Sequence, residues 1–468
     1  MDALLTILAL LLLGIPGLLF VSLVVPGPAP DRAALIMGYG LLAGLVGVPV
    51  ILRLLDSLGL PLSFAVSGST VAAVCVALLL LMRLGSRTRP DLPPRKLESV
   101  PIVDRVVVLV LLALIGSKAV VLTAEVTWRP LFPWDATMHW ATKARVWLEH
   151  LELRPFVSNP EWLTARASDI YTDKHPFYPI TIPLLQLWMT SALGYWNESL
   201  MNLPWVLCYT GLGAAFYGQA REAGASLMSA AAFTYFLMSM PLLNTHVALA
   251  GYADLFLGSC YCLAIMAFHN WALHRQRWQA VLAVVFAISC LLIKNEGFFW
   301  LLTFIPATVV VVYPGRRTLL ALCVALGIGV MGLLLFPRDV VVAGHSLDSL
   351  RIYFRPEAVK PVFDSFFVHD SWHLFAYLLA GLLAATLMVN RTAFADFRGI
   401  MVALASAAVL FLFLYLFTAH ATGAVRFTSI GRISLQLVPA ALFLCLLLFN
   451  SLRAGEKHQV QAGSPGAS

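Results

Sequence analysis

Residues 105–126 read RVVVLVLLALIGSKAVVLTAEV, an apolar run with few charges in it. A helix of that length crosses roughly 30 Å of hydrocarbon. Apolar runs of similar length recur along nearly the whole chain, which is 468 residues long, 60% hydrophobic and 12% charged. A water-soluble core has no room for so much apolar surface, so the sequence predicts an all-α polytopic membrane protein.

The apolar runs predict a bundle of about thirteen transmembrane helices. They lie at residues 3–25, 33–55, 62–83, 105–126, 200–220, 226–242, 252–270, 279–293, 297–314, 318–337, 370–390, 399–419 and 432–451. The first run has no basic segment before it, so we expect a retained span rather than a cleaved leader. Residues 180–194 are short and follow Pro176 and Pro179, which favours a half-inserted or tilted helix.

The basic residues indicate an orientation. If residues 180–194 do not cross, the basic loops share one side, which the positive-inside rule assigns to the cytoplasm. Their members are Arg83, Arg87, Arg89, Arg95, Lys96, Arg105, Arg221, Arg275, Arg277, Arg316, Arg317, Arg391, Arg398 and Arg453. The other side receives residues 127–178, 244–254, 294–297, 337–370 and 420–432. Since these segments hold most of the unusual polar residues, we expect the working face to be extracytoplasmic.

Charge, cysteine content and composition limit the alternatives. The net charge of +7 sits in short loops rather than in a basic domain, so we expect lipid contact and no nucleic-acid partner. The seven cysteines lie inside apolar runs and are expected to serve packing. A linker rich in proline and charge separates a three-span extension at 1–104 from the rest of the chain. The rest is divided into a module at 105–317, which carries most of the motifs described below, a C-terminal module at 318–452 and a tail at 453–468 that is expected to be disordered.

The sharpest motif is Pro133-Trp134-Asp135-Ala136, directly after a span. At helical spacing His139 and Lys143 share one face with Asp135, while Trp140 and Trp147 lie on another. We expect an interfacial helix with its indoles at headgroup depth and its charges facing protein or water. The alternative is that Asp135 only caps the helix.

Two further motifs lie on the same predicted side. The segment DIYTDKHPFYP at 169–179 places His175 and Tyr178 beside rigid prolines, whereas Asp169 and Asp173 suit an ordinary solvated loop equally well. Asp254, in Gly251-Tyr252-Ala253-Asp254, begins a span; it is either functional or a partner of the helix dipole.

Cations complete the set of candidates. Lys294 and Glu296 break an otherwise very long apolar stretch, either as a simple hairpin or as part of a phosphate site. Arg426 and Arg432 lie at the mouth of the last span, where they either bind phosphate oxygens or snorkel to lipid headgroups. Carboxylates, a histidine and cations on one face suit a general base beside a departing phosphate.

These motifs, in this order, resemble the landmarks of bacterial GT-C-fold membrane glycosyltransferases, a superfamily that includes protein O-mannosyltransferases and aminoarabinose transferases. The matching residues are Trp134-Asp135-Ala136, His175-Pro176, Tyr178-Pro179, Tyr252-Ala253-Asp254, Lys294-Asn295-Glu296-Gly297 and Arg432. The chain departs from that family in having three spans before the equivalent first span and in having no large C-terminal periplasmic domain.

The resemblance implies a GT-C-like fold and a function in cell-envelope glycan biosynthesis at the bacterial inner membrane, with the site facing the periplasm or exterior. The donor would be a polyprenyl-phosphate-linked sugar and the acceptor an extracytoplasmic glycan, lipid or protein. By this resemblance Asp135 is the general base of an inverting transfer, Asp254 is the second acidic position, and Lys294 and Arg432 face the donor phosphate. The remaining residues expected to bind substrate are His139, Lys143, His175, Tyr178, Glu296 and Arg426.

Other functions remain open at this point. A flippase for a lipid-linked saccharide should carry charges along a transmembrane path, ideally in two similar halves, whereas here they gather on one face. A structural subunit of a polysaccharide-export complex would leave Asp135 and Lys294 without a task. No cofactor is required by the sequence; a divalent metal held by Asp135 and Asp254 is compatible with it but not predicted.

Overall fold

The structure is a computed structural model that describes residues 1–85, 101–165, 169–335, 341–342, 345–346, 348 and 351–462. The first half contains α1 (Asp2–Val24), α2 (Arg32–Ser57), α3 (Phe64–Gly85), α4 (Ile102–Trp128), the π-helix η2 (Ala136–Ala141), α5 (Thr142–His150), β1 (Phe156–Val157), α6 (Asn159–Thr164), β2 (Tyr171–Thr172), α7 (Thr181–Leu193), η3 (Leu200–Asn202), α8 (Pro204–Glu222), α9 (Leu227–Ser239) and α10 (Pro241–Ala248). The second half contains α11 (Asp254–His274), α12 (Arg277–Ile293), α13 (Glu296–Leu302), α14 (Phe304–Val312), α15 (Arg316–Leu335), β3 (Val341–Val342), β4 (His345–Ser346), η4 (Pro356–Ala358), α17 (Val359–Phe367), α18 (Phe375–Val389), α19 (Ala393–Phe417), α20 (Ala421–Val425), α21 (Ile430–Leu435) and α22 (Val438–Ala462).

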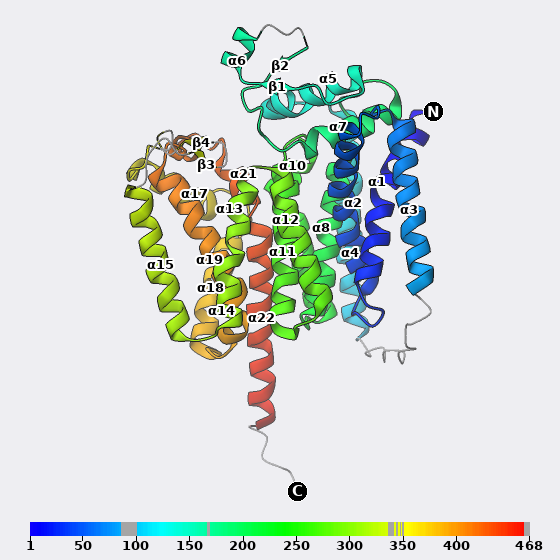
Figure 1. The fold of residues 1–468 in the computed structure, drawn as a ribbon. Helices are drawn as coiled ribbons and strands as arrows, with labels where there is room; N and C mark the ends of the chain where they lie inside the picture. The colour runs from blue at the N-terminus through cyan, green and yellow to red at the C-terminus, as the bar shows by residue number, and fades with distance from the viewer. Residues whose placement is uncertain are drawn as a thin grey trace.

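The prediction of an all-α protein is confirmed for the described residues, since the four strands have two residues each. β1 and β2 pair in parallel, and β3 and β4 pair antiparallel. Figure 1 shows the long helices side by side in one bundle, with α5, α6 and both strand pairs at one end. We call this end the loop end.

Helices occupy all thirteen predicted segments, but the number of spans stays a prediction. Among the described residues, six helices are long and apolar enough to cross a membrane, namely α1, α2, α3, α4, α11 and α19. A seventh span forms if α9 and α10, which meet at 56°, are counted together. α7 has 13 residues, about 20 Å at 1.5 Å per residue, in keeping with the short helix expected there.

Several predicted boundaries are wrong. Residues 244–248, expected in an external loop, lie in α10 (Pro241–Ala248), because Pro241 suits the first turn of a new helix. The last predicted span, at 432–451, is divided into α21 and α22. α22 continues through Ala462 into the segment predicted to be disordered, and the linker residues 86–100 and the tail residues 463–468 lie outside the described residues.

Glycines bring the first two helices together. A side-chain carbon added at Gly17 of α1 would lie 2.0 Å from the backbone oxygen of Gly40 in α2. One at Gly38 would lie 2.1 Å from the backbone nitrogen of Ala215 in α8. Small residues permit such close helix approach in membranes, so the N-terminal helices are attached tightly to the central bundle.

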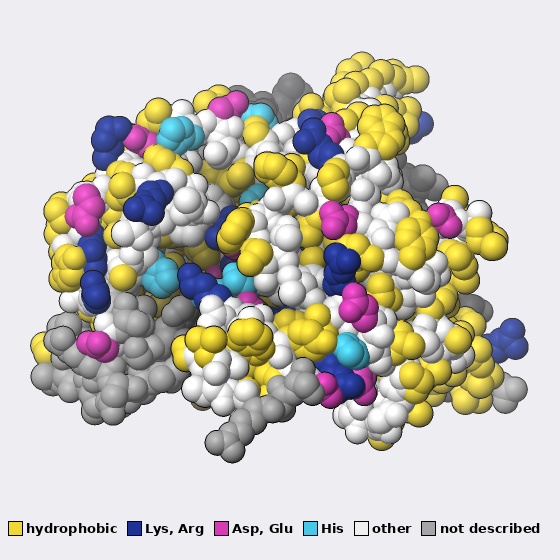
Figure 2. Space-filling model, turned by 90° about the horizontal axis from the view of Figure 1, so that it is seen from above, with side chains coloured by type: hydrophobic (Ala, Val, Ile, Leu, Met, Phe, Trp, Pro, Cys, Tyr) yellow, Lys and Arg dark blue, Asp and Glu magenta, His cyan; other side chains and the backbone are white. Residues whose placement is uncertain are grey.

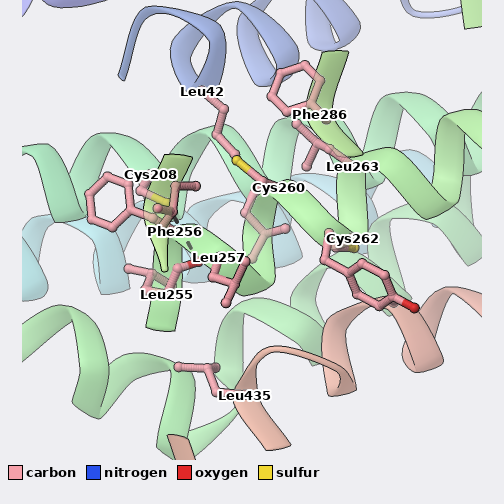
Figure 3. Close-up of a cluster of buried hydrophobic side chains, with 14 of the residues drawn as sticks. Leu42, Cys208, Leu255, Phe256, Leu257, Cys260, Cys262, Leu263, Phe286 and Leu435 are labelled. Atoms are coloured by element: carbon pink, nitrogen blue, oxygen red, sulfur yellow. Dashed lines mark hydrogen bonds between the residues drawn. The ribbon is translucent and has the colours of Figure 1, made fainter. Parts of the chain in front are cut away.

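α11 occupies the centre of the bundle. Figure 3 shows Leu255, Cys260 and Leu263 of this helix among side chains from α2, α8 and α12. All seven cysteines are free, and every one except Cys323 is buried, as expected for a packing role. A rigid central helix therefore fixes the position of its own first residue, Asp254, at the loop end.

Candidate active site

Asp254 is fully buried at the first turn of α11. Its Oδ1 accepts a hydrogen bond from Lys294 Nζ at 2.9 Å and another from the Gln436 side-chain amide at 2.6 Å. Lys294 also forms an ion pair with Glu296 at 2.8 Å. The aspartate, the lysine and the glutamate, all predicted site residues, therefore lie in one cluster.

The chain around Lys294 explains how a lysine reaches this place. α12 ends at Ile293, Lys294 takes an extended conformation, and α13 begins at Glu296. A side-chain carbon at Gly297 would lie 2.0 Å from the backbone oxygen of Cys290, so the sharp break needs a glycine. The break turns Lys294 back toward α11.

Gln436 is held in one orientation by a tryptophan. The Trp300 indole donates to Gln436 Oε1 at 2.6 Å, which leaves the amide nitrogen to donate to Asp254. Both Trp300 and Gln436 are buried. Gln436 lies in the short break between α21 and α22, and this break also places Arg432 at the cluster.

Asp135 forms an ion pair with Arg432, 297 residues away in the sequence. The Arg432 guanidinium also lies over the Tyr252 ring, 4.8 Å from its centre. Asp135 precedes the π-helix η2, and π-helical turns often occur at functional sites. The base and the cation inferred from the resemblance are therefore direct neighbours.

A second carboxylate, Asp173, organises the next part of the site. It accepts hydrogen bonds from His139 Nδ1 at 2.5 Å and from the His175 backbone N–H at 3.1 Å. Lys143 forms an ion pair with the same carboxylate and donates to the His175 backbone oxygen at 3.3 Å. Since Asp173 is only 5% exposed, the sequence-based view of it as a possible solvated loop residue is wrong.

Aromatic rings connect the two carboxylate sites. The ring centres of His139 and His175 are 4.9 Å apart, those of His175 and Tyr178 are 5.0 Å apart, and Tyr178 stacks on Trp140 at 5.3 Å. Trp140 and Trp147 are buried in protein, and their depth in a membrane stays a prediction. Trp134 and Met138 are the exposed apolar side chains there.

Burial and charge change the acid–base properties of the loop residues. Burial alone would raise the pKa of Asp173, but the hydrogen bonds from His139 and Lys143 lower it to about 2. Burial, and next the nearby His139, lower the pKa of His175. Burial, followed by the charge of Glu296, raises the pKa of Tyr178 to about 12. At neutral pH Asp173 is therefore ionised, while His175 and Tyr178 are neutral.

Several buried polar atoms at this cluster have no hydrogen-bond partner within the described chain. They are Asp254 Oδ2, Glu296 Oε2, Arg432 Nε and His246 Nδ1. Leaving a buried polar atom unpaired costs about 1–3 kcal/mol, and more when the group is charged. The two carboxylate oxygens can accept hydrogen bonds from hydroxyl groups, and Arg432 Nε can donate one to a phosphate oxygen. The cluster therefore suits a ligand that carries both kinds of group.

The surface at the loop end is hollowed above this cluster of charged residues (Figure 2). Figure 2 looks onto the loop end and shows a hollow near its middle where basic, acidic and histidine side chains gather. A small surface depression lies beside the chain that leads to Asp135, lined by residues that include Arg129, Phe132 and Asn202.

Not every predicted residue joins the cluster. Arg426 is exposed and makes no ion pair among the described residues. Asp173, Gln436, Tyr252 and His246 belong to the site but were not predicted as site residues. Of these, Tyr252 lies within a quoted motif, and Asp173 lies two residues before His175, so nearness to a motif is the signal that could have found them.

In the described part of the chain, no group of three or more His, Cys, Asp or Glu side chains is arranged to hold a metal ion. The two carboxylates considered for a metal, Asp135 and Asp254, each face a cationic side chain instead. Comparison of the chain with protein-family models, curated proteins and solved structures gives no match. The case for a function therefore rests on the chemistry of the clustered residues.

Proposed function

We propose that the protein is a GT-C-type glycosyltransferase that moves a sugar from a polyprenyl-phosphate donor to an extracytoplasmic acceptor with inversion. The observation that carries the proposal is the pairing of Asp135 with Arg432 beside the pairing of Asp254 with Lys294. It places a possible general base next to two cations that suit phosphate. The cluster lies at one end of helices that can cross a membrane, where a lipid-linked donor presents its sugar.

Each charged group of the cluster has a role in the proposed reaction. The acceptor oxygen attacks the anomeric carbon while Asp135 takes the hydroxyl proton. The bond between the anomeric carbon and the phosphate oxygen breaks, and its electron pair leaves with the polyprenyl phosphate. Lys294 and Arg432 stabilise the charge that develops on this phosphate, and Asp254 and Glu296 orient the sugar through their unpaired oxygens.

The direct test uses purified protein in nanodiscs with a labelled polyprenyl-phosphate sugar and a membrane extract that contains acceptors. Asp135→Asn keeps the side-chain shape but removes the base, so transfer should fall by about a thousandfold or more. Asp169→Asn is the matched control, because Asp169 lies in the same loop with its side chain 67% exposed. Unchanged turnover by Asp135→Asn would contradict the mechanism.

A flippase for the same lipid is the alternative. The same preparation separates the two functions, because an enzyme cleaves the sugar–phosphate bond whereas a flippase only moves the intact lipid. Appearance of free polyprenyl phosphate supports the enzyme. Transfer of intact donor across the bilayer without cleavage supports the flippase.

A further inference from the structure

Two candidate bases lie four residues apart at the start of one short helix, and they differ in what they bind. Asp135 forms an ion pair with Arg432 through Oδ2. His139, four residues later on η2, binds Asp173 through Nδ1. Within the part of the chain that the structure describes, His139 Nε2 has no hydrogen-bond partner, and it is not among the atoms sealed from solvent.

From this arrangement, and resting on the proposed function, we infer that His139 and Asp173 form a relay that removes the proton from Asp135 after transfer. The proton passes from the acceptor hydroxyl to the Asp135 carboxylate and then to His139 Nε2, which gives an imidazolium. The imidazolium then transfers its Nε2 proton to water, and the neutral ring is restored. The relay makes no bond to the sugar or to the phosphate.

The hydrogen bond to Asp173 fixes the state of the histidine. Because the carboxylate accepts from Nδ1, the proton of the neutral ring lies on Nδ1 and the lone pair lies on Nε2. Asp173 is itself held by Lys143 and by the His175 backbone, so the ring is anchored in place. When the ring takes a second proton, the negative Asp173 stabilises the resulting positive charge.

The ion pair of Asp135 supplies the reason for a relay. A protonated Asp135 is neutral and no longer forms an ion pair with Arg432, whose side chain is only 23% exposed. Passing the proton on restores the carboxylate and the ion pair, and the base is ready for another acceptor. A proton that stayed on Asp135 would leave a largely buried cation unpaired.

The charged and titratable groups around the His139 ring are few. Asp173, Lys143 and His175 contact the ring or its partner, and Asp135 lies about one helical turn away. α7, which packs against η2, contributes no charged side chain. The opposite charges of Lys143 and Asp173 lie together beside the His139 ring.

The test compares the pH dependence of kcat for wild type, His139→Gln and Asp173→Asn. General acid–base groups contribute roughly 10²- to 10⁴-fold, and we expect kcat to fall at least tenfold in His139→Gln with KM little changed. The acidic limb of the profile, where histidine ordinarily changes charge between about pH 5 and pH 8, should shift in both variants. His150→Gln is the control, because His150 is an exposed histidine on the adjacent α5 that bonds Tyr171 at 2.7 Å.

Rescue separates a relay from a structural role. Imidazole added to His139→Ala should restore part of kcat, which a merely structural loss would not allow. Wild-type kcat and an unshifted profile in His139→Gln, or a loss that imidazole does not rescue, would overturn the relay. If Asp135→Asn is inactive while His139→Gln behaves as wild type, only the relay fails; if Asp135→Asn is active, the proposed function fails first.

Discussion

The two ends of α11 carry two different buried polar clusters. Asp254 at its first turn belongs to the charged cluster with Lys294, whereas Asn270, 16 residues or about 24 Å along the helix, belongs to a neutral one. In the neutral cluster the Gln219 amide donates to Tyr39 at 2.8 Å and to Gln279 at 2.9 Å, and it accepts from Asn270. Every one of these groups is uncharged.

The clusters differ in what they leave unpaired. Among the residues that the structure describes, oxygens of Asp254 and Glu296 and a nitrogen of Arg432 have no partner at the charged end. At the neutral end an Asn270 oxygen has none, and neither has the ring of His269, which packs on Phe397 and Phe443. Unpaired charged groups cost more than unpaired neutral ones. The neutral cluster therefore links helices by hydrogen bonds, while the charged cluster costs stability and, under the proposed function, would bind the donor.

The largest effect is expected from Lys294→Met. It leaves Asp254, whose side chain is 1% exposed, as an uncompensated buried charge, which should cost about 3–5 kcal/mol of unfolding free energy. The double variant Lys294→Met with Asp254→Asn should regain most of that stability but no transfer activity. Thermal unfolding in detergent measures the stability, and the transfer assay measures the activity. Normal transfer by the double variant would show that the ion pair of Asp254 and Lys294 is not needed for transfer.

Gln219→Leu tests the neutral end. It leaves the Asn270 and Gln279 amides without their shared partner and should lower stability by about 1–3 kcal/mol. Transfer kinetics of the folded fraction should not change, since the site is about 24 Å away. A lower kcat with an unchanged unfolding temperature in Gln219→Leu would contradict a purely structural role for the neutral cluster.

The pH dependence of the loop follows from Asp173. Its pKa is lowered from 3.8 to about 2 in the folded protein, so the stabilisation that it provides is fully present above about pH 4. That stabilisation is lost as the pH falls from 3.8 towards 2. Pepsin cleavage within residues 136–180 should rise over this range in wild type, and Asp173→Asn should be cleaved as readily at pH 4 as wild type is near pH 2. Equal cleavage of both proteins at pH 4 would contradict this assignment.

Trp300→Phe should have the smallest effect. It removes only the indole donor that orients Gln436, a neutral hydrogen bond worth about 1 kcal/mol. We expect a small loss of stability and a severalfold loss of kcat, because Gln436 can turn away from Asp254. Trp188→Phe is a suitable control, since Trp188 is a buried tryptophan whose indole donates to the Ala9 backbone oxygen at 3.0 Å instead of to Gln436.

The helices were predictable because they are long and apolar. The run at 33–55 corresponds to α2 (Arg32–Ser57), and the run at 399–419 lies within α19 (Ala393–Phe417) apart from its last two residues. The break after Ile293 was predicted, because the charges of Lys294 and Glu296 interrupt the apolar run. The break before Val438 was not predicted, because an apolar run looks the same in the sequence whether it forms one helix or two. These two breaks carry Lys294 and Gln436 into the site.

The composition of the site was predictable only in part. A span followed by Trp134-Asp135, and a lysine within an apolar stretch, stand out in the sequence because charges are costly there. That Asp135 meets Arg432 depends on contacts between segments 297 residues apart, which local patterns do not reveal. Asp173 was misjudged for the same reason, since only its contacts with His139 and Lys143 distinguish it from a loop residue.

The proposed donor site is tested most sharply by a cryo-electron microscopy structure of the protein in nanodiscs with a polyprenyl-phosphate sugar. We expect density for the phosphate within hydrogen-bond distance of Lys294 and Arg432, with the sugar beside Asp135 and Asp254. Donor density at the neutral end of α11, or on the lipid-facing side of the bundle away from these residues, would contradict it.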